Sequence, residues 1–242
     1  MLQGLLESEV FSLNNNIENV KKYGASGFEN TYYLGYRDIP ELLKKYVRGS
    51  RAIDYGCGTG RSTRFLRECG FTTLGVDLSR EMLEKALEDD QDHHYIAIEN
   101  AKIPVLDSSY DLVFSCFVLL VVPTKKDLLA ILNEAYRCLK EGGIFIIVTG
   151  SEYLYSYDWL SYNVDYPENE FPKSGKSMKI QLVDLGVDFI NYYWTDADYT
   201  ELFASAGFAL LEKRFPLGTT LDNKGWVSED QYPPYVVYVL QK

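Results

Sequence analysis

Three glycines in residues 52–63, "AIDYGCGTGRST", have a spacing that could bind a ligand. Gly56, Gly58 and Gly60 follow a short apolar run and precede an amphipathic segment. A glycine-rich bend after a buried strand lets the main chain approach a ligand closely. The helix that follows offers free N–H groups to anionic atoms. The stretch therefore indicates a nucleotide-like ligand.

Two well-known phosphate loops differ from this one. The dinucleotide fingerprint G-x-G-x-x-G has its third glycine one position later, where this chain has Arg61. A P-loop requires a Lys-Ser or Lys-Thr pair, and none follows. The spacing thus argues against an NAD(P)-dependent oxidoreductase, which we retain as an alternative, and excludes a P-loop enzyme.

A second candidate is Asp77 in "LGVDLS", where the next apolar run ends. Two carboxylate oxygens match the two hydroxyls of a ribose, so an acidic residue at this place suits a nucleoside. The alternative is structural, because Asp77 could instead cap the helix expected from residue 80.

The elements that must position these residues alternate between strands and helices. Apolar strands without polar alternation are buried on both faces, which favours a parallel sheet covered by helices. The sequence therefore predicts a doubly wound α/β fold. Expected strands are 51–56, 71–79, 93–100, 109–122, 144–150, 208–215 and 235–242, and expected helices are 38–48, 62–70, 80–89, 125–143 and 196–207. Asp38 is expected to cap the first helix.

The composition limits the classes of function. The 242 residues suffice for one large domain, and a net charge of −11 argues against a nucleic-acid partner. The apolar runs are strand-sized and the N-terminus lacks the features of a signal peptide, so we expect a cytoplasmic protein with no membrane partner. The four cysteines lack CxxC spacing, which favours buried thiols over a metal site. We expect a monomer or homodimer.

The motifs resemble, in order, those of class I S-adenosylmethionine-dependent methyltransferases of the methyltransferase 11 type. The quoted stretches are "AIDYGCGTGRST", "LGVDLS", "ENAKIPVLDSSYD", "YDLVFSCFVLLVV" and "CLKEGGIFIIV". The resemblance implies a Rossmann-like, seven-stranded, mostly parallel sheet, S-adenosylmethionine as cofactor and S-adenosylhomocysteine as product. It implies cofactor contacts from Asp54, Gly56, Cys57, Gly58, Thr59, Gly60, Asp77, Leu78, Asn100, Ala101, Ser115 and Phe117. The family usually has Asp-Ala where this chain has Asn100-Ala101, and an amide oxygen can still accept from the adenine amino group.

The resemblance also implies how some of these side chains act. Asp54 would hold the glycine loop and approach the cofactor's ammonium group. Cys57 has no sequence neighbour that would activate its thiol, so we expect a small residue filling the bend. We expect an N-terminal lid over residues 1–37, in which Tyr33 and Arg37 meet the cofactor and Arg37 binds its carboxylate. The alternative is a surface helix whose tyrosines cover the sheet.

The expected domain is a single unit over residues 1–242. The cofactor-binding core is 38–150, an aromatic-rich cap insertion is 151–195, and a C-terminal helix and strands follow in 196–242. The cap follows the carboxyl end of a strand, where open α/β sheets bind ligands. The expected substrate residues, against the alternative that they form the core of the cap, are Tyr153, Tyr155, Trp159, Tyr193 and Trp194.

The acceptor is expected to be a small planar or heterocyclic molecule. Methyl transfer from a sulfonium needs alignment more than a base. The only histidines, His93 and His94, precede the third strand, which favours N-methylation or an acidic hydroxyl. The segments "TGSEYLYSYDWLS" and "YYWTDADY" also resemble toxoflavin-type N-methyltransferases. A non-catalytic S-adenosylmethionine-binding regulator is a further alternative.

Overall fold

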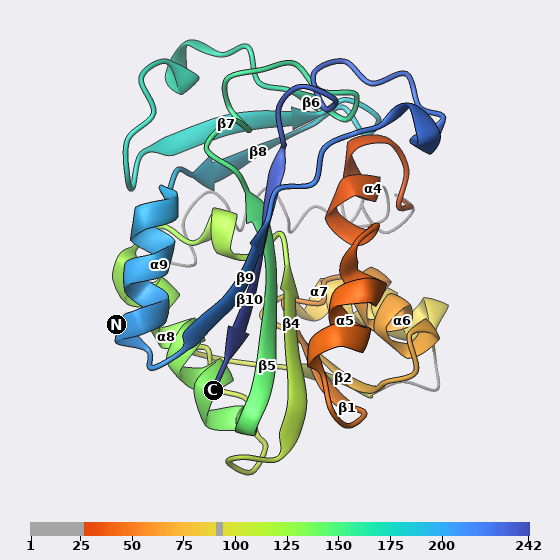
Figure 1. Cartoon of the computed structure of the whole chain (residues 1–242), viewed down its shortest axis with the longest axis vertical. Helices are drawn as coiled ribbons and strands as arrows, with labels where there is room; N and C mark the ends of the chain where they lie inside the picture. Colours follow the sequence, from red (N-terminus) through yellow and green to blue (C-terminus); the bar gives the residue numbers. More distant parts are fainter. Residues whose placement is uncertain (1–26, 91–93) are drawn as a thin grey trace.

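Seven strands form the central sheet of the protein, which we describe from a computed structural model for residues 27–90 and 94–242. Their order across the sheet is β3-β2-β1-β4-β5-β10-β9 (Figure 1). They are β1 (Arg51–Tyr55), β2 (Thr72–Asp77), β3 (His94–Ala97), β4 (Tyr110–Cys116), β5 (Leu139–Gly150), β9 (Ala209–Arg214) and β10 (Tyr235–Gln241). Strand β10 is antiparallel to both β5 and β9, whereas β3, β2, β1, β4 and β5 pair in parallel. The predicted doubly wound, mostly parallel fold is confirmed.

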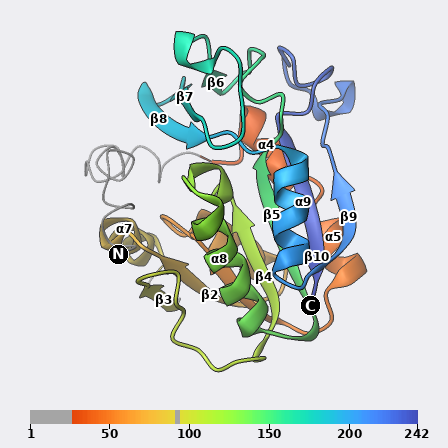
Figure 2. The same ribbon diagram turned by 90° about the vertical axis from the view of Figure 1, so that its left-hand side faces the viewer.

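Helices cover both faces of this sheet because alternate side chains of each strand point to opposite faces. Ala52 of β1 and Phe114 of β4 pack with α4 (Asn30–Tyr36), α5 (Ile39–Tyr46) and α6 (Arg61–Glu68). Ile53 and Val113, their strand neighbours, pack with α8 (Lys125–Cys138) and α9 (Asp196–Ser205) on the other face (Figure 2). The remaining helix, α7 (Arg80–Asp89), contacts β2 and β3.

Short polar side chains begin three of these helices. Ser79 accepts a hydrogen bond from Met82 N at the start of α7, and Thr124 and Thr195 do the same for α8 and α9. The expected cap at Asp38 is wrong, because its carboxylate makes no cap bond and instead accepts from the Arg37 guanidinium.

The turn between α8 and β5 also differs from the expectation. The sequence predicts a helix through residue 143, but α8 ends at Cys138 and β5 begins at Leu139. Gly142, with φ of 72°, lies inside β5, where the pairing with β4 shifts register between Tyr110 and Leu112. The glycines thus mark an irregular strand rather than the end of a helix.

The insertion between β5 and α9 forms a small antiparallel sheet above the strand ends (Figure 1). Its strands are β6 (Tyr162–Asn163), β7 (Ser177–Leu182) and β8 (Val187–Tyr192), with β7 in the middle. The sequence predicts the insertion but not its regular strands. The alternation was visible in "SMKIQL", whose apolar residues are buried and whose polar residues are not.

Within the described ranges, no helix has both the length and the apolar character needed to cross a lipid bilayer.

Candidate cofactor and acceptor site

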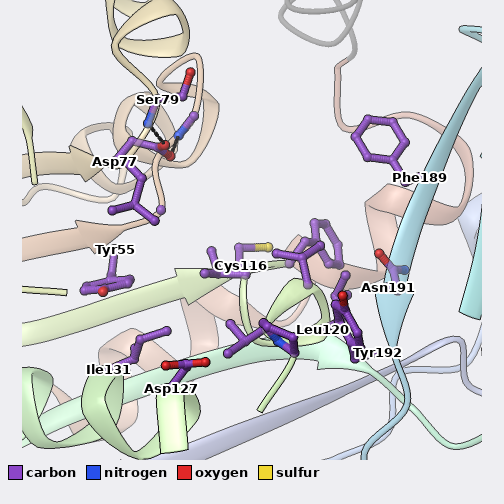
Figure 3. Close-up of a pocket in the computed structure, with 18 of the residues that line it drawn as sticks. Tyr55, Asp77, Ser79, Cys116, Leu120, Asp127, Ile131, Phe189, Asn191 and Tyr192 are labelled. Atoms are coloured by element: carbon purple, nitrogen blue, oxygen red, sulfur yellow. Dashed lines mark hydrogen bonds between the residues drawn. The ribbon is translucent and has the colours of Figure 1, made fainter. Parts of the chain in front are cut away.

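A cavity lies between the carboxyl ends of the parallel strands and the cap sheet, and Figure 3 shows a close-up of its lining. One end is formed by the loops after β1, β2 and β4, and the other by the cap, α4 and β10. The sequence-predicted residues that line it are Gly56, Gly58, Asp77, Leu78, Asn100, Ala101 and Phe117. The structure therefore brings together residues from four separate strand ends, those of β1, β2, β3 and β4.

The glycine loop combines a tightly packed position with an open one. A Cβ on Gly56 would lie 2.3 Å from Val118 Cγ2, and its φ of 74° is left-handed, so a side chain does not fit there. Gly58 also has a left-handed φ of 53°, but nothing lies within 4 Å of its Cβ position. The Gly56 and Cys57 amides donate to Val76 O, at 2.8 and 3.0 Å, and so tie the loop to β2. Gly58 is thus the place where a ligand could approach the main chain.

Asp77 connects this loop to the start of α7 (Figure 3). Its Oδ2 accepts from the Gly58 amide at 2.8 Å, and its Oδ1 accepts from the Ser79 amide at 2.9 Å. Each carboxylate oxygen can accept a second hydrogen bond, so both can also bind hydroxyls of a ligand. Burial raises the pKa of Asp77. Because Ser79 is the N-cap of α7, the alternative role of Asp77 as that cap is not observed.

Asp54 lies fully buried beneath the glycine loop. Its Oδ2 accepts from the hydroxyls of Ser62 and Thr63, at 2.7 and 2.6 Å, and so fixes the start of α6. Its Oδ1 has no hydrogen-bond partner among the described residues. Burial raises the pKa of Asp54 to about 6. An unsatisfied buried carboxylate oxygen beside the loop fits a positively charged group of a cofactor.

Three of the seven described residues other than glycine that have a positive φ line the same cavity. Asn100 and Ala101 have φ values of 52° and 62°, and Phe117 has 61°. Residues other than glycine rarely adopt this region, and the cost is about 1–3 kcal/mol for each. Three such residues lining one cavity support a binding role for this end of the sheet.

Other predicted cofactor residues lie behind the lining. Asp54, Cys57, Thr59, Gly60 and Ser115 belong to the loop and its neighbouring strands but are not among the lining residues. Cys57 is buried, and burial raises the pKa of its thiol well above the usual value. It packs beside Gly75 of β2, as a small residue filling a bend would.

The structure does not bring Arg37 or Tyr33 to the cavity. The Arg37 guanidinium donates to Asp38 and to Leu217 O at 2.8 Å, and Tyr33 lies under the Lys224 ammonium group. A basic group near the site is instead supplied by Arg61, whose guanidinium lies 5.1 Å from the centre of the Tyr32 ring. Its position directly after the glycine turn was the available signal.

The cap lines the cavity with residues other than the predicted ones. Tyr153 is 43% exposed, whereas Tyr155, Trp159, Tyr193 and Trp194 are buried, and none of the five lines the cavity. The lining comes instead from both strands of the β7–β8 pair and their neighbours. Its members in the cap are Leu154, Tyr162, Ile180, Leu182, Phe189, Asn191 and Tyr192.

The one histidine among the described residues does not line the cavity. His94 is exposed in β3, and His93 lies outside the described residues, as do residues 1–26 of the expected lid.

The sequence and the fold are similar to known methyltransferases. Residues 53–147 match the family described as "Methyltransferase domain". A malonyl-[acyl-carrier protein] O-methyltransferase of Serratia marcescens is 37% identical over 101 residues, which are 42% of this chain and 38% of that protein. One of Hamiltonella defensa is 31% identical over 151 residues, which are 58% of this chain and 57% of that protein. The chain thus matches about two fifths to three fifths of these relatives' lengths.

Among solved structures, an S-adenosylmethionine-dependent methyltransferase from Mesorhizobium loti superposes with a TM-score of 0.62 at 19% identity. The match covers 86% of this chain and 98% of that one. With the strand order and the cavity, these similarities define a class I methyltransferase fold. More specifically, residues 53–147 match the methyltransferase 11 family, as the sequence predicts, and S-adenosylmethionine is the cofactor that this match implies.

Proposed function

We propose that the protein transfers a methyl group from S-adenosylmethionine to a carboxylate oxygen of a small or carrier-bound acyl molecule. The relatives named above are O-methyltransferases of malonyl-acyl carrier protein, and a malonyl group ends in a free carboxylate. An acceptor oxygen thus replaces the nitrogen that the sequence favours.

The chemistry of the cavity supports this acceptor. All of its lining residues belong to the described part of the chain, and none is a lysine, arginine or histidine. Most are apolar or aromatic, and the two carboxylates, Asp77 and Asp127, belong to the strand-end side. A carboxylate acceptor suits such a site because it arrives deprotonated and needs no base.

An apolar site also favours this particular displacement. A sulfonium cation and a carboxylate anion react to give two neutral products, so charge disappears along the reaction. Opposite charges attract more strongly in a low-dielectric site than in water, and the site excludes the water that would shield them. The cofactor itself then supplies the positive charge that holds the acceptor, which explains how a lining without basic groups could bind an anion.

The residues at the strand ends would hold the cofactor. Asp77 would accept from the ribose hydroxyls, Gly58 would allow close approach, and the buried Asp54 beneath the loop would attract the ammonium group. Leu78 and Ala101 would contact the adenine ring, as the resemblance implies. When bound, the cofactor supplies the activated methyl group.

The dependence of the rate on pH tests the acceptor class. With labelled S-adenosylmethionine and malonyl-acyl carrier protein, the rate is expected to stay flat from about pH 6.5 to 9, because a carboxylate is ionised throughout. With an amine acceptor, the rate would instead rise about tenfold for each unit that the pH increases, until the pH reaches the pKa of the amine.

The product gives a second, independent readout. A methyl ester releases labelled methanol in alkali, whereas an N-methyl group does not. Label retained in alkali, or transfer only to nitrogen heterocycles, would overturn the proposal. Cofactor binding without transfer to any acceptor would favour the regulatory alternative.

A further inference from the structure

The inward face of the cap sheet is apolar except at one position. Side chains two residues apart on a strand share a face. The β7–β8 register places five apolar residues and one asparagine in the same double row, Met178, Ile180, Leu182, Val187, Phe189 and Asn191. Four of the six line the cavity, and Asn191 lies directly opposite Met178. Asn191 therefore interrupts an apolar surface with a carboxamide.

Burial makes this asparagine costly for stability. Asn191 is 4% exposed, and it lines the cavity next to Phe189 and Tyr192 of the same strand (Figure 3). An amide in apolar surroundings destabilises a protein unless a hydrogen bond compensates for the lost water. A leucine would continue the row without that cost. The amide thus needs a hydrogen-bond partner that an apolar residue would not.

The described residues leave part of the Asn191 carboxamide unpaired. Within the described ranges, no hydrogen bond at ordinary geometry uses this side chain. The polar group beside it is the hydroxyl of Tyr155, which is itself buried without a hydrogen-bond partner among the described residues. A carboxamide has two N–H donors, and one hydroxyl can accept from only one of them. At least one N–H of Asn191 is therefore available to a molecule bound in the cavity.

The position and chemistry of the carboxamide suit an anionic acceptor. Asn191 and Asp77 lie at opposite ends of the cavity in Figure 3, so the amide is on the acceptor side. An amide N–H donates a strong, charge-assisted hydrogen bond to a carboxylate oxygen. It carries no net charge, so it can bind the acceptor without competing with the cofactor's positive charge for the anion. It also cannot remove a proton, which a carboxylate acceptor does not require.

We propose that Asn191 donates a hydrogen bond from its amide N–H to one oxygen of the acceptor carboxylate and so directs the other oxygen to the methyl group. This inference rests on the proposed function. In the step, the new O–C bond forms from a carboxylate lone pair as the C–S bond of the cofactor breaks. The electron pair of the broken bond stays on sulfur, and no proton moves. The products are a methyl ester and S-adenosylhomocysteine with a neutral sulfur.

The first test is Asn191→Leu, which removes the donor and nearly keeps the size of the side chain. Loss of a hydrogen bond to a charged group is expected to lower kcat/KM for malonyl-acyl carrier protein by about 10–100-fold. The affinity for S-adenosylhomocysteine, measured by calorimetry, should stay within about twofold, because Asn191 is remote from Asp77. The midpoint of denaturant unfolding should not fall, because leucine continues the apolar row. A structural amide would instead show a lower midpoint.

The second test is Asn191→Asp, which keeps the shape and changes the hydrogen bonding with pH. Once ionised, the introduced carboxylate repels the acceptor carboxylate, so kcat/KM should fall below that of Asn191→Leu. Burial raises the pKa of a carboxyl group, and its protonated form donates a hydrogen bond. Relative to the wild type at the same pH, kcat/KM should therefore recover at least about tenfold between about pH 8 and pH 6.

Asn163→Asp provides a matched control for the added charge. Asn163 is half-buried on β6 of the same cap sheet and does not line the cavity. Its Oδ1 accepts from the Asp165 amide at 3.0 Å, and a carboxylate oxygen can do the same. This variant should keep kcat/KM within about twofold of the wild type at every pH.

The outcomes separate the two proposals. Wild-type kcat/KM in both Asn191 variants, with active wild-type protein, would overturn the role of Asn191 and leave the proposed function standing. A loss in Asn191→Asp that is the same at every pH, or an equal loss in Asn163→Asp, would also overturn it. A wild-type protein that methylates neither malonyl-acyl carrier protein nor malonyl-coenzyme A would overturn the proposed function, and the role of Asn191 with it.

Discussion

The cofactor end and the acceptor end of the cavity are built by different means. At the cofactor end, a ligand would meet the open main chain at Gly58 and the Asp77 carboxylate that accepts from the Gly58 amide. At the acceptor end, the lining is the apolar face of a small antiparallel sheet, with Tyr32 and Tyr235 beside it. At the cofactor end, backbone conformation decides which groups reach the cavity. At the acceptor end, the residues that reach it are those on the inward face of each strand.

Because of this difference, we expect substitutions at the two ends to have different effects. The amide and the carboxylate of the cofactor end bind each other directly, so one change there alters several hydrogen bonds at once. The cap lining consists mainly of apolar side chains, and no carboxylate there connects two loops as Asp77 does, so a change there is expected to alter fewer hydrogen bonds. Substitutions at the two ends should therefore affect different measured quantities.

The largest expected effect comes from Asp54 at the cofactor end. Its pKa is about 6 in the folded protein and near 3.8 when exposed, so between these values only the folded state holds the proton. Stability is therefore lost as pH rises from about 4 to 6, by about 3 kcal/mol in total. Because the raised pKa of Asp77 acts in the same direction, the contribution of Asp54 is the difference between the losses that denaturant unfolding measures for the cofactor-free wild type and for Asp54→Asn.

The Asp54→Asn comparison also tests the carboxylate's role toward the cofactor. The amide oxygen can still accept from Ser62 and Thr63, which keeps the start of α6 in place. The affinity for S-adenosylhomocysteine should nevertheless fall, because its ammonium group loses a charged partner. An unchanged affinity would leave Asp54 with a structural role alone.

Asp77→Ala should have the next largest effect. It removes the carboxylate that the ribose hydroxyls would share with Gly58 and Ser79, and should weaken cofactor binding by about 1–3 kcal/mol. The acceptor KM, measured at saturating cofactor, should change little. Unchanged cofactor affinity by calorimetry would contradict the ribose assignment, and an equal change in acceptor KM would contradict the separation of the two ends.

The same contrast explains what the sequence could predict. Gly56, Gly58 and Asp77 were predictable because backbone conformation and strand ends impose a fixed spacing on them. Spacing did not reveal that Arg37 is held by Asp38 while Arg61 lies near the site, because the path of a long side chain depends on tertiary neighbours.

The cap was predictable as a region but not residue by residue. Aromatic density marks residues 151–195 as unusual, yet a shift of one position moves a strand residue to the opposite face. Tyr192 lines the cavity, whereas the predicted Tyr193 is buried in the cap.

The contrast between Tyr192 and Tyr193 gives the prediction with the smallest expected effect. Tyr192→Leu should raise the acceptor KM by about two- to fivefold with little loss of stability, because it changes one partly exposed wall of the cavity. Tyr193→Leu should instead cost about 1–2 kcal/mol of stability, measured by denaturant unfolding, and leave the acceptor KM unchanged. The reverse pattern would mean that the acceptor binds on the other face of the cap. Equal effects of both substitutions would mean that the two faces of the cap act as one cooperative unit.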